Sequence, residues 1–373
     1  MFFYLKTGGG HLAPARAVSE KIRASKKGKI EITLADGLSS SSKMLKKIIE
    51  DGYKHSVNKA MWTFELIYAF HKIRAVSRLT SSVVSYFIRP AVEKQILSVN
   101  PDKIVIFHFF LIKPVFEILE KNNLEIPVLT VVTDPFTAHP IWFLHKEHNY
   151  IVFSEILKEV CINKGIDAKN IKVFPFVLDQ KYSRKISKNR IALIRQNLGF
   201  RPDSKIILIM GGGDGMPRGK KILKNILTNN IDAEIAIVCG NNKKMYRHVS
   251  RLQEKLGLRN VKIYGFVDFI HSLINISDVV ISKCGASTFM EILLSGKVQI
   301  ISDYVWEQEK GNMEFVCKGE MGILEKDTSK IPLILNRLLT DQKFYDYHIN
   351  NIRKASIING VVPVSEYIIE FNA

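Results

Sequence analysis

Residues 282–312 read SKCGASTFMEILLSGKVQIISDYVWEQEKGN, and the fold of the chain can be worked out from this stretch. An apolar run at 279–281 comes just before the turn at its start, and a second apolar run lies at 298–301. Between them, residues 289–294 carry the apolar spacing of a helix. A strand, a helix and a second strand form the repeating unit of a parallel sheet with covering helices. The stretch therefore predicts an α/β protein.

The turn between the first strand and the helix consists of small residues, Gly285, Ala286 and Ser287. Small side chains let a phosphate approach the free N–H groups at a helix N-terminus, where the helix dipole favours negative charge. We therefore expect this turn to hold a diphosphate. The alternative is an ordinary helix start, in which Thr288 and Glu291 form a capping box.

The second strand is followed by residues 306–312, which read WEQEKGN and are rich in side chains that form hydrogen bonds. Open α/β sheets bind their ligands at the carboxyl ends of the strands, which is where this segment begins. Its amide and carboxylate groups suit the hydroxyls of a sugar. The alternative is a loop that is merely solvated.

The length of the chain, 373 residues, suits two domains that each bury a core. No run of about 18 apolar residues occurs, and we expect a cytosolic or peripheral protein without a cleaved leader. The four cysteines, Cys161, Cys239, Cys284 and Cys317, are scattered and form no C-x-x-C pair. We expect reduced thiols and no metal site.

The formal net charge of +18 indicates an anionic partner. Nucleic acid, an acidic membrane surface and a nucleotide diphosphate are all compatible with it, and composition does not choose among them. A biased genome composition that favours lysine, isoleucine and asparagine would raise the charge without any partner.

The first half begins with a strand at 2–5, a glycine loop that ends at His11, and an alanine-rich helix. No G-x-G-x-x-G follows the strand, so a nicotinamide cofactor is excluded here. Two nearly unbroken apolar runs, at 103–107 and 128–132, predict buried parallel strands. Because functional groups gather at the carboxyl edge of such strands, we expect His11 to converge with residues that follow these strands, namely His108, Asp134 and His139.

The region from 39 to 97 is basic and aromatic throughout. Such a mixture is typical of interfacial helices on an anionic bilayer, and we expect membrane contact here. The alternative is a set of amphipathic helices whose apolar side packs on the sheet. The residues concerned are Lys43, Met44, Leu45, Lys46, Lys47, Lys54, Lys59, Trp62, Phe64, Ile67, Tyr68, Phe70, Lys72, Arg74, Arg78, Tyr86, Phe87 and Arg89.

The second half repeats strands and helices in strict alternation, which predicts a doubly wound sheet. The strands are expected at 206–210, 234–238, 261–264, 279–282 and 298–301, and a strand at 30–34 is expected in the first half. Four glycines cluster at 211–215, where bare backbone permits close approach of a ligand. The alternative is a tight strand-to-helix turn without a ligand.

These motifs together resemble the GT-B glycosyltransferases of the monogalactosyldiacylglycerol synthase and processive diacylglycerol glucosyltransferase family, which are related to the peptidoglycan N-acetylglucosaminyltransferase. The resemblance is carried, in family order and over nearly the whole chain, by residues 282–312 and by the following groups: Gly8-Gly9-Gly10-His11, Thr133-Asp134, His139-Pro140-Ile141-Trp142-Phe143, Gly211-Gly212-Gly213-Asp214-Gly215 and Gly265-Phe266-Val267.

The resemblance implies a GT-B fold, with two facing Rossmann-like domains and a cleft between them. It places an acceptor- and membrane-binding domain at 1–177, a nucleotide-sugar domain at 178–344, and closing helices at 345–373 that cross back to the first domain. It also implies that a few residues precede the first strand. The protein would be a peripheral, monotopic protein on the cytoplasmic face of the cell membrane.

The resemblance also implies roles for individual residues. His11 is the first choice for the catalytic base and Asp134 the second, because an ordinary histidine pKa near 6.5 suits a base. The acceptor-side residues are Gly9, Gly10, His108, His139 and Trp142. The donor-side residues are Gly212, Gly213, Phe266 for the uracil, Lys283, Gly285, Ala286, Ser287 and Thr288 for the diphosphate, Glu291 for the ribose, and Gln308, Glu309 and Asn312 for the sugar.

The implied reaction is inverting transfer of a hexose from UDP-galactose or UDP-glucose to diacylglycerol, with galactose favoured and no metal required. Transfer of N-acetylglucosamine to a polyprenyl-linked acceptor is one alternative, although the H-P-x-W-F and E-K-G-N segments argue against it. A non-catalytic, basic lipid-binding protein is another. Sterol or ceramide acceptors stay open, and nucleic acid is not expected as a partner.

Overall fold

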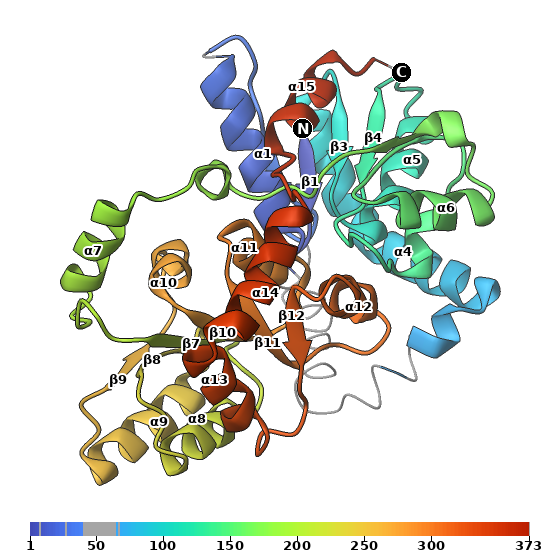
Figure 1. Ribbon diagram of the computed structural model, residues 1–373. Coiled ribbons are helices and arrows are strands. Elements are labelled where there is room, and N and C mark those ends of the chain that lie inside the picture. The colour runs from blue at the N-terminus through green and yellow to red at the C-terminus, as the bar shows by residue number, and fades with distance from the viewer. Residues whose placement is uncertain (7–8, 27, 40–64, 66–67, 373) are drawn as a thin grey trace. The chain divides into compact units, whose positions relative to one another are not determined.

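The computed structural model describes residues 1–6, 9–26, 28–39, 65 and 68–372 (Figure 1). The chain divides into two compact units. The first comprises Met1–Gln180, Trp306–Gly311 and Asn359–Ala373, and the second comprises Lys181–Val305 and Asn312–Ile358. The division differs from the expected domains at three places, because residues 178–180 and 306–311 belong with the first unit and residues 345–358 with the second.

The first unit is built on a six-stranded sheet in the order β2-β1-β3-β4-β5-β6, and every pairing is parallel. Strand order reverses between β1 and β3, the point at which open sheets of this kind bind ligands. The strands are β1 (Phe2–Tyr4), β2 (Leu34–Asp36), β3 (Ile104–Ile106), β4 (Val128–Val131), β5 (Asn149–Val152) and β6 (Ile171–Val173).

The apolar runs of the sequence form the buried strands of this sheet, as expected for strands that helices cover on both faces. The second strand, expected at 30–34 and ending at Asp36, is present as β2 and ends at Asp36, but its pairing with β1 begins only at Leu34, four residues later than expected. The carbonyl of Ile32 is bound instead by the guanidinium of Arg23. This side-chain hydrogen bond satisfies a backbone carbonyl that a neighbouring strand would otherwise bind.

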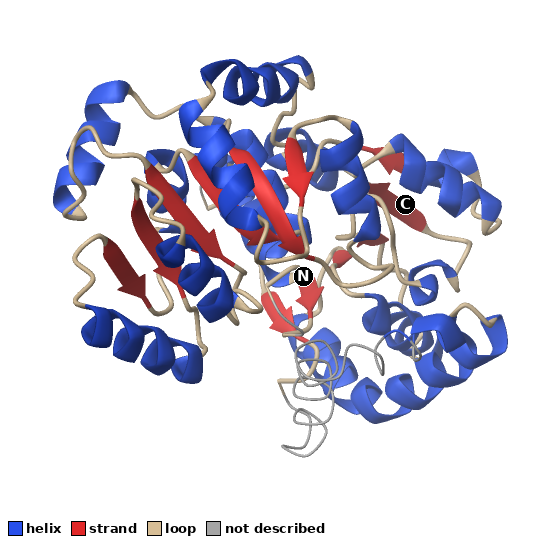
Figure 2. Ribbon diagram, turned by 60° about the horizontal axis from the view of Figure 1, so that its bottom comes forward, coloured by secondary structure: helices blue, strands red, loops and turns tan. Residues whose placement is uncertain are grey.

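Helices flank both sheets (Figure 2). Those of the first unit are α1 (Leu12–Ser25), α4 (Arg74–Val99), α5 (Ile112–Lys121), α6 (Glu155–Asn163) and α15 (Val361–Glu370), with short 3₁₀ turns η1 (Phe109–Leu111), η2 (Pro140–Phe143) and η3 (Ala168–Asn170). The turn η4 (Gln180–Ser183) lies at the boundary of the units. The C-terminal α15 packs against α1, and Lys103 donates to the carbonyls of Ile368 and Ile369.

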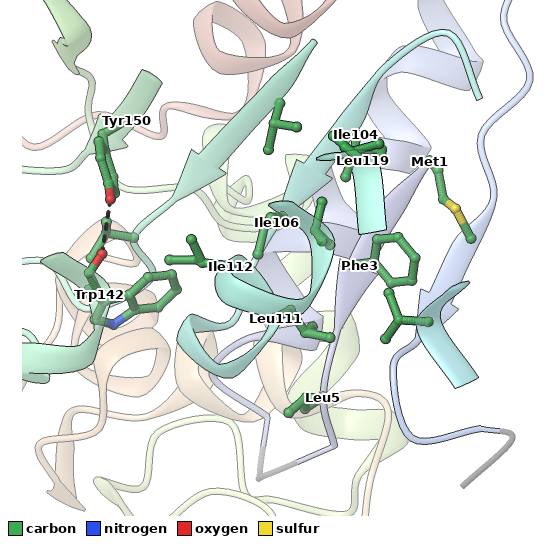
Figure 3. Close-up of a cluster of buried hydrophobic side chains, with 14 of the residues drawn as sticks. Met1, Phe3, Leu5, Ile104, Ile106, Leu111, Ile112, Leu119, Trp142 and Tyr150 are labelled. Atoms are coloured by element: carbon green, nitrogen blue, oxygen red, sulfur yellow. Dashed lines mark hydrogen bonds between the residues drawn. The ribbon is translucent and has the colours of Figure 1, made fainter. Parts of the chain in front are cut away.

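The core of the first unit gathers side chains from β1 and β3 with those of η1 and α5 (Figure 3). Trp142 and Tyr150 extend this core towards the end of β4 and β5, where the Tyr150 hydroxyl donates to the Trp142 carbonyl at 3.1 Å. Both rings are fully buried. Buried aromatic side chains therefore pack beneath the carboxyl ends of β4 and β5.

The second unit has a six-stranded parallel sheet in the order β12-β11-β10-β7-β8-β9. This is the doubly wound order, with the reversal between β7 and β10. The strands are β7 (Ile206–Met210), β8 (Glu234–Val238), β9 (Val261–Tyr264), β10 (Val279–Lys283), β11 (Val298–Asp303) and β12 (Gly322–Leu324).

The helices of the second unit are α7 (Lys188–Asn197), α8 (Gly219–Thr228), α9 (Lys243–Leu256), α10 (Ile270–Ile276), α11 (Ala286–Leu294), α12 (Lys310–Lys318), α13 (Ile331–Thr340) and α14 (Gln342–Lys354). The first two residues of α12 pack with the first unit. In the described part of the chain no helix is long and apolar enough to cross a membrane.

Candidate active site

The donor half of the candidate site starts at the first turn of α11. The helix begins at Ala286, three residues earlier than the apolar pattern indicates, and its N-cap Gly285 provides no side-chain hydrogen bond. Thr288 is thus the third helical residue, and the capping box with Glu291 is wrong because Thr288 does not stand at the N-cap. The N–H groups of this first turn are free of a side-chain cap, which is the arrangement that binds phosphate.

Ser287 adds a second polar group to this turn. Its hydroxyl oxygen is buried and has no hydrogen-bond partner among the described residues. A buried hydroxyl without a partner is uncommon in folded proteins, and a bound anion would satisfy it. This turn therefore has the chemistry of an anion site.

Glycines lie across from the α11 turn, in the loop after β7. A Cβ on Gly212 would lie 4.0 Å from Thr288 Oγ1, and Gly212 has a φ of +76°. Gly212 and Gly213 are exposed, whereas a side chain on Gly211 or Gly215 would strike the loop's own backbone or that of Cys239. Two of these glycines are therefore required by the turn, and the other two leave open backbone beside Thr288.

The same edge continues over β8 and β9. A Cβ on Gly240, after β8, would lie 2.8 Å from the Gly213 carbonyl carbon, and one on Gly265, after β9, would lie 3.9 Å from the Gly240 carbonyl oxygen. Phe266 follows Gly265, and 68% of its surface is exposed. The loops after β10, β7, β8 and β9 thus form one row of bare backbone from Thr288 to an exposed aromatic ring.

Lys283 and Asn312 flank the α11 turn. The register between β10 and β11 shifts at Lys283, an irregularity that turns a side chain relative to the regular pleat. Asn312 is buried in α12 and donates from Nδ2 to the Cys284 carbonyl at 3.1 Å. Its Oδ1 has no partner among the described residues. The amide therefore holds the start of the turn and keeps one acceptor unused.

The acceptor half lies in the first unit, where His11, His108 and Asp134 follow β1, β3 and β4. The rings of His11 and His108 are 4.3 Å apart, and Phe109 stacks on His139 at 4.8 Å. The strands β1 and β3 flank the point where strand order reverses, and β4 is the next strand beyond β3. The expected set of polar residues is therefore brought together at one edge of this sheet.

His11 is buried, and its Nδ1 lies 2.6 Å from the Thr133 hydroxyl. Burial, which disfavours the charged imidazolium, lowers the pKa of His11 to about 4, although a hydrogen bond to the Phe107 carbonyl opposes the shift. The ring is neutral at pH 7. A base with so low a pKa takes a proton from an alcohol less readily than an ordinary histidine.

Asp134 shows the opposite shift. Burial is the largest of the causes that raise the pKa of its carboxyl group to about 6. The charge of Glu309 acts in the same direction, whereas hydrogen bonds from Trp142 and Gln308 act against it. The Trp142 indole donates from Nε1 to Oδ2 at 2.9 Å. The pKa argument that favoured His11 over Asp134 is therefore reversed, since the buried carboxylate is the stronger base of the two.

Gln308 and Glu309 lie beside Asp134 because the segment 306–311 packs within the first unit. The Thr137 hydroxyl donates to the Gln308 carbonyl at 2.8 Å, and Lys72 forms an ion pair with Glu307 at 3.0 Å. These two residues were expected in the donor domain with Asn312, but only Asn312 belongs to the second unit. The role of Lys72 and Thr137 in holding the segment has no signal in the sequence.

Several acceptor-side residues have structural roles as well. The Nδ1 atoms of His108 and His139 cap η1 and η2 by accepting from backbone N–H groups. Burial lowers the pKa of His139 to about 3, and Trp142 is fully buried rather than exposed to an acceptor. A side chain on Gly9 or Gly10 would meet nothing within 4 Å, so open space adjoins the loop.

Some residues of the sequence patterns lie outside the described part of the chain. Gly8 and much of the basic, aromatic region are among them. In that region these are Lys43, Met44, Leu45, Lys46, Lys47, Lys54, Lys59, Trp62, Phe64 and Ile67.

Comparison with known protein families matches the two halves of the chain separately. Residues 11–177 match the family described as monogalactosyldiacylglycerol (MGDG) synthase, and residues 206–357 match the glycosyltransferase family 28 C-terminal domain. Each match covers one of the two sheets described above.

Relatives named for the same activity align along most of the chain. The probable monogalactosyldiacylglycerol synthase 2 of Oryza sativa subsp. japonica is 27% identical over 365 residues, which cover 94% of this chain and 74% of the rice protein. The synthase of Spinacia oleracea is 27% identical, over 87% of this chain and 63% of its own length. The chain thus spans about two thirds to three quarters of these chloroplast proteins.

Solved glycosyltransferase structures share the fold. Anabaena HepE in complex with UDP-glucose superposes with a TM-score of 0.58 at 16% identity, over 99% of this chain and 97% of its own. MurG of Acinetobacter baumannii superposes with a TM-score of 0.56 at 15% identity, over 99% of both chains. The architecture of two doubly wound parallel sheets is therefore the GT-B architecture, and the chain is similar to the monogalactosyldiacylglycerol synthases in its first half and to family 28 glycosyltransferases in its second.

Proposed function

We propose that this chain is a glycosyltransferase that moves a hexose from a UDP-sugar to the hydroxyl of diacylglycerol, with inversion at the anomeric carbon. Galactose is the favoured sugar, because the relatives are named for monogalactosyl transfer, and glucose is the alternative. The observation that carries the proposal is the uncapped first turn of α11, which faces bare glycine backbone at the switch point of the second sheet.

The donor would lie along the row of loops from α11 to β9. The N–H groups of residues 286–288 and the Ser287 hydroxyl would bind the diphosphate, with Lys283 supplying a positive charge. Phe266 would stack on the uracil, and Glu291 would accept hydrogen bonds from the ribose hydroxyls. Because these groups oppose the charge that develops on the leaving diphosphate, the donor would need no metal ion.

The acceptor would be activated in the first unit by Asp134. Its carboxylate would take the proton of the diacylglycerol hydroxyl while the oxygen of that hydroxyl forms a bond to the anomeric carbon. The bond from the anomeric carbon to the diphosphate breaks, and its electron pair leaves with UDP. A base with a pKa of about 6 is ionised at neutral pH and still strong enough to assist this step.

His11, in this proposal, is second to Asp134 as the base and lines the acceptor position. Its neutral ring lies within the group formed by His108 and Trp142. Gln308 and Glu309, beside Asp134, would orient the sugar at the point where the acceptor attacks. Asn312 would use its unpartnered Oδ1 for a sugar hydroxyl.

Peripheral membrane binding forms part of this proposal, because the acceptor is a lipid. The α4 helix buries one face, which includes Ile88, Val92 and Ile96, and exposes large apolar side chains on the other. Leu79 is 67% exposed and Tyr86 68% exposed, and Val83, Phe87 and Leu97 share their side of the helix. Arg74, Arg78 and Arg89 lie on the same helix, and such a mixture suits the interface of an anionic bilayer.

Radiolabelled UDP-galactose and UDP-glucose, offered with diacylglycerol, ceramide, sterol or lipid II in mixed micelles, test the proposal directly. We expect labelled glycolipid from diacylglycerol, and about 10²–10⁴-fold slower labelling with the Asp134→Asn variant. Preferential labelling of lipid II over diacylglycerol would overturn the proposed acceptor. Binding of lipid without turnover of any donor would indicate a non-catalytic protein.

A further inference from the structure

Two helices of the second unit present a surface of almost one charge. The helix α8 exposes Lys220, Lys221 and Lys224, and α9 exposes five more cations. Glu254 is the single acidic residue within these two helices. We call this set the α8–α9 basic surface, and it consists of Lys220, Lys221, Lys224, Lys243, Lys244, Arg247, Arg251 and Lys255.

The cations of α9 form a row. Lys243, Arg247, Arg251 and Lys255 are spaced by four residues, which places them on one side of the helix over roughly 18 Å. The buried residues Met245 and Val249 hold the other side against the unit. The row therefore faces solvent along the whole helix.

The row on α9 and the lysines of α8 belong to one surface, because the two helices pack against each other (Figure 1). The ring of His248 lies among these cations, because its pKa is lowered first by desolvation and then by the charges of Lys220, Lys244, Arg251 and Arg247. Lys220 comes from α8 and the other three from α9. Cations from both helices thus act on the same point.

Within the described part of the chain none of the eight cations forms an ion pair with a carboxylate, although the charge of Lys221 acts on the Asp327 carboxylate at longer range. Most of the charge of this surface is therefore not neutralised there. Surface lysines elsewhere do have such partners, for example Lys121 with Glu93 at 2.8 Å and Lys318 with Glu314 at 3.0 Å. Like charges four residues apart on a helix repel each other. An external anion would relieve this repulsion.

We infer that the α8–α9 basic surface binds the anionic headgroups of a lipid bilayer. The inference rests on the proposed function, since a lipid acceptor brings the enzyme to a membrane, and it adds a contact in the second unit to that of α4. Tyr246 is 41% exposed beside the row, and Leu256 is 51% exposed at its end. Such side chains enter the interfacial layer of a bilayer, which favours a lipid surface as the partner.

The test compares two variants that lose the same charge from the same unit. The first carries Lys220→Gln, Lys244→Gln, Arg247→Gln and Arg251→Gln. The matched control carries Arg184→Gln, Lys185→Gln, Lys188→Gln and Arg190→Gln, four exposed cations at and before α7. Binding of the full chain is measured by sedimentation with phosphatidylcholine vesicles that contain or lack 30% phosphatidylglycerol, chosen as about the anionic share of an acidic membrane.

Each cation near an anionic surface strengthens binding roughly fivefold, so loss of four predicts a fall on the order of several hundredfold, and less at high salt. We expect this fall for the first variant on anionic vesicles and a much smaller one for the control. Equal losses in both variants, or no loss in the first, would overturn the inference. Retained vesicle binding with lost binding to a duplex oligonucleotide would reassign the surface to nucleic acid.

Turnover of UDP-sugar with acceptor dispersed in neutral detergent separates this inference from the proposed function. Both variants should keep that turnover, because none of the residues substituted in either variant belongs to the proposed site. If the wild-type chain shows no turnover but the first variant alone loses vesicle binding, the proposed function fails and the surface assignment stands.

Discussion

Replacing Trp142 by phenylalanine should move the acid limb of the turnover–pH profile to higher pH. The indole N–H donates to Asp134 Oδ2 at 2.9 Å, and this bond lowers the pKa of Asp134. A hydrogen bond to a charged group contributes about 1.5–3 kcal/mol, and one pKa unit corresponds to about 1.4 kcal/mol. Loss of the bond should therefore raise the pKa of Asp134 by roughly one to two units above its present value of about 6.

The measurement is kcat from about pH 5 to pH 9 with saturating donor and acceptor, because a group in the enzyme–substrate complex then sets the limb. A base works in its deprotonated form, so turnover should rise tenfold per pH unit below the pKa of Asp134 and level off above it. In Trp142→Phe the level region should begin one to two units higher, with the same plateau.

Tyr150→Phe is the matched control. Its hydroxyl donates to the Trp142 carbonyl at 3.1 Å and to the His145 carbonyl, but it has no bond to Asp134. The control should lower the melting temperature and leave the acid limb in place. A limb that moves equally in both variants would mean general loosening of the core. A folded Trp142→Phe enzyme with an unmoved limb would refute Asp134 as the base.

Further predictions concern the same groups. Asp134→Asn should reduce turnover by about 10²–10⁴-fold. It should also stabilise the fold above pH 6 by up to roughly 3 kcal/mol in urea titrations, because the pKa of Asp134 is raised in the folded protein, which therefore loses stability as the pH rises through about 6. A destabilised variant would contradict this. Glu291→Gln should weaken UDP binding in calorimetry by about 1.5–3 kcal/mol with unchanged helical content, and unaltered affinity would remove Glu291 from the ribose site. Burial holds the pKa of His11 at about 4 and that of His139 at about 3. The free energy of unfolding should therefore decrease as the pH falls from 6.5 towards these values, because in this range only the unfolded chain binds protons at the two histidines. A urea midpoint that stays constant over this range would show that the two rings are not buried as described. Turnover should survive EDTA, and restoration by added Mg²⁺ or Mn²⁺ would show that the donor site uses a metal.

The sequence alone determined the architecture of the second unit with high accuracy. The strands Ile206–Met210, Glu234–Val238 and Val261–Tyr264 have the predicted bounds. The first two are fully buried and mostly apolar, as expected of strands covered on both faces, whereas the third is a half-buried edge strand. In the first unit, the positions of His11, His108 and Asp134 at strand ends followed from the apolar runs of that half of the chain. The sequence did not predict α7 or β12, since α7 is charged and largely exposed and β12 is a three-residue edge strand.

Tertiary structure decided the start of α11. The apolar pattern begins at Phe289 because residues 286–288 are small or polar, yet the helix includes them and leaves Gly285 at its cap. Periodicity detects only the residues that a helix buries, so it does not register a first turn that faces outward. The anion-binding character of the turn depends on those three residues.

Tertiary structure also decided the order of base strength. By their ordinary pKa values a histidine is a better base than an aspartate, and burial reverses this order because it disfavours the charged form of both, an imidazolium and a carboxylate. The contact of Gln308 and Glu309 with Asp134 likewise joins residues more than 170 positions apart. Residue types and spacing determine which groups reach a sheet edge, whereas desolvation and long-range neighbours, which exist only in the folded chain, determine the protons those groups carry.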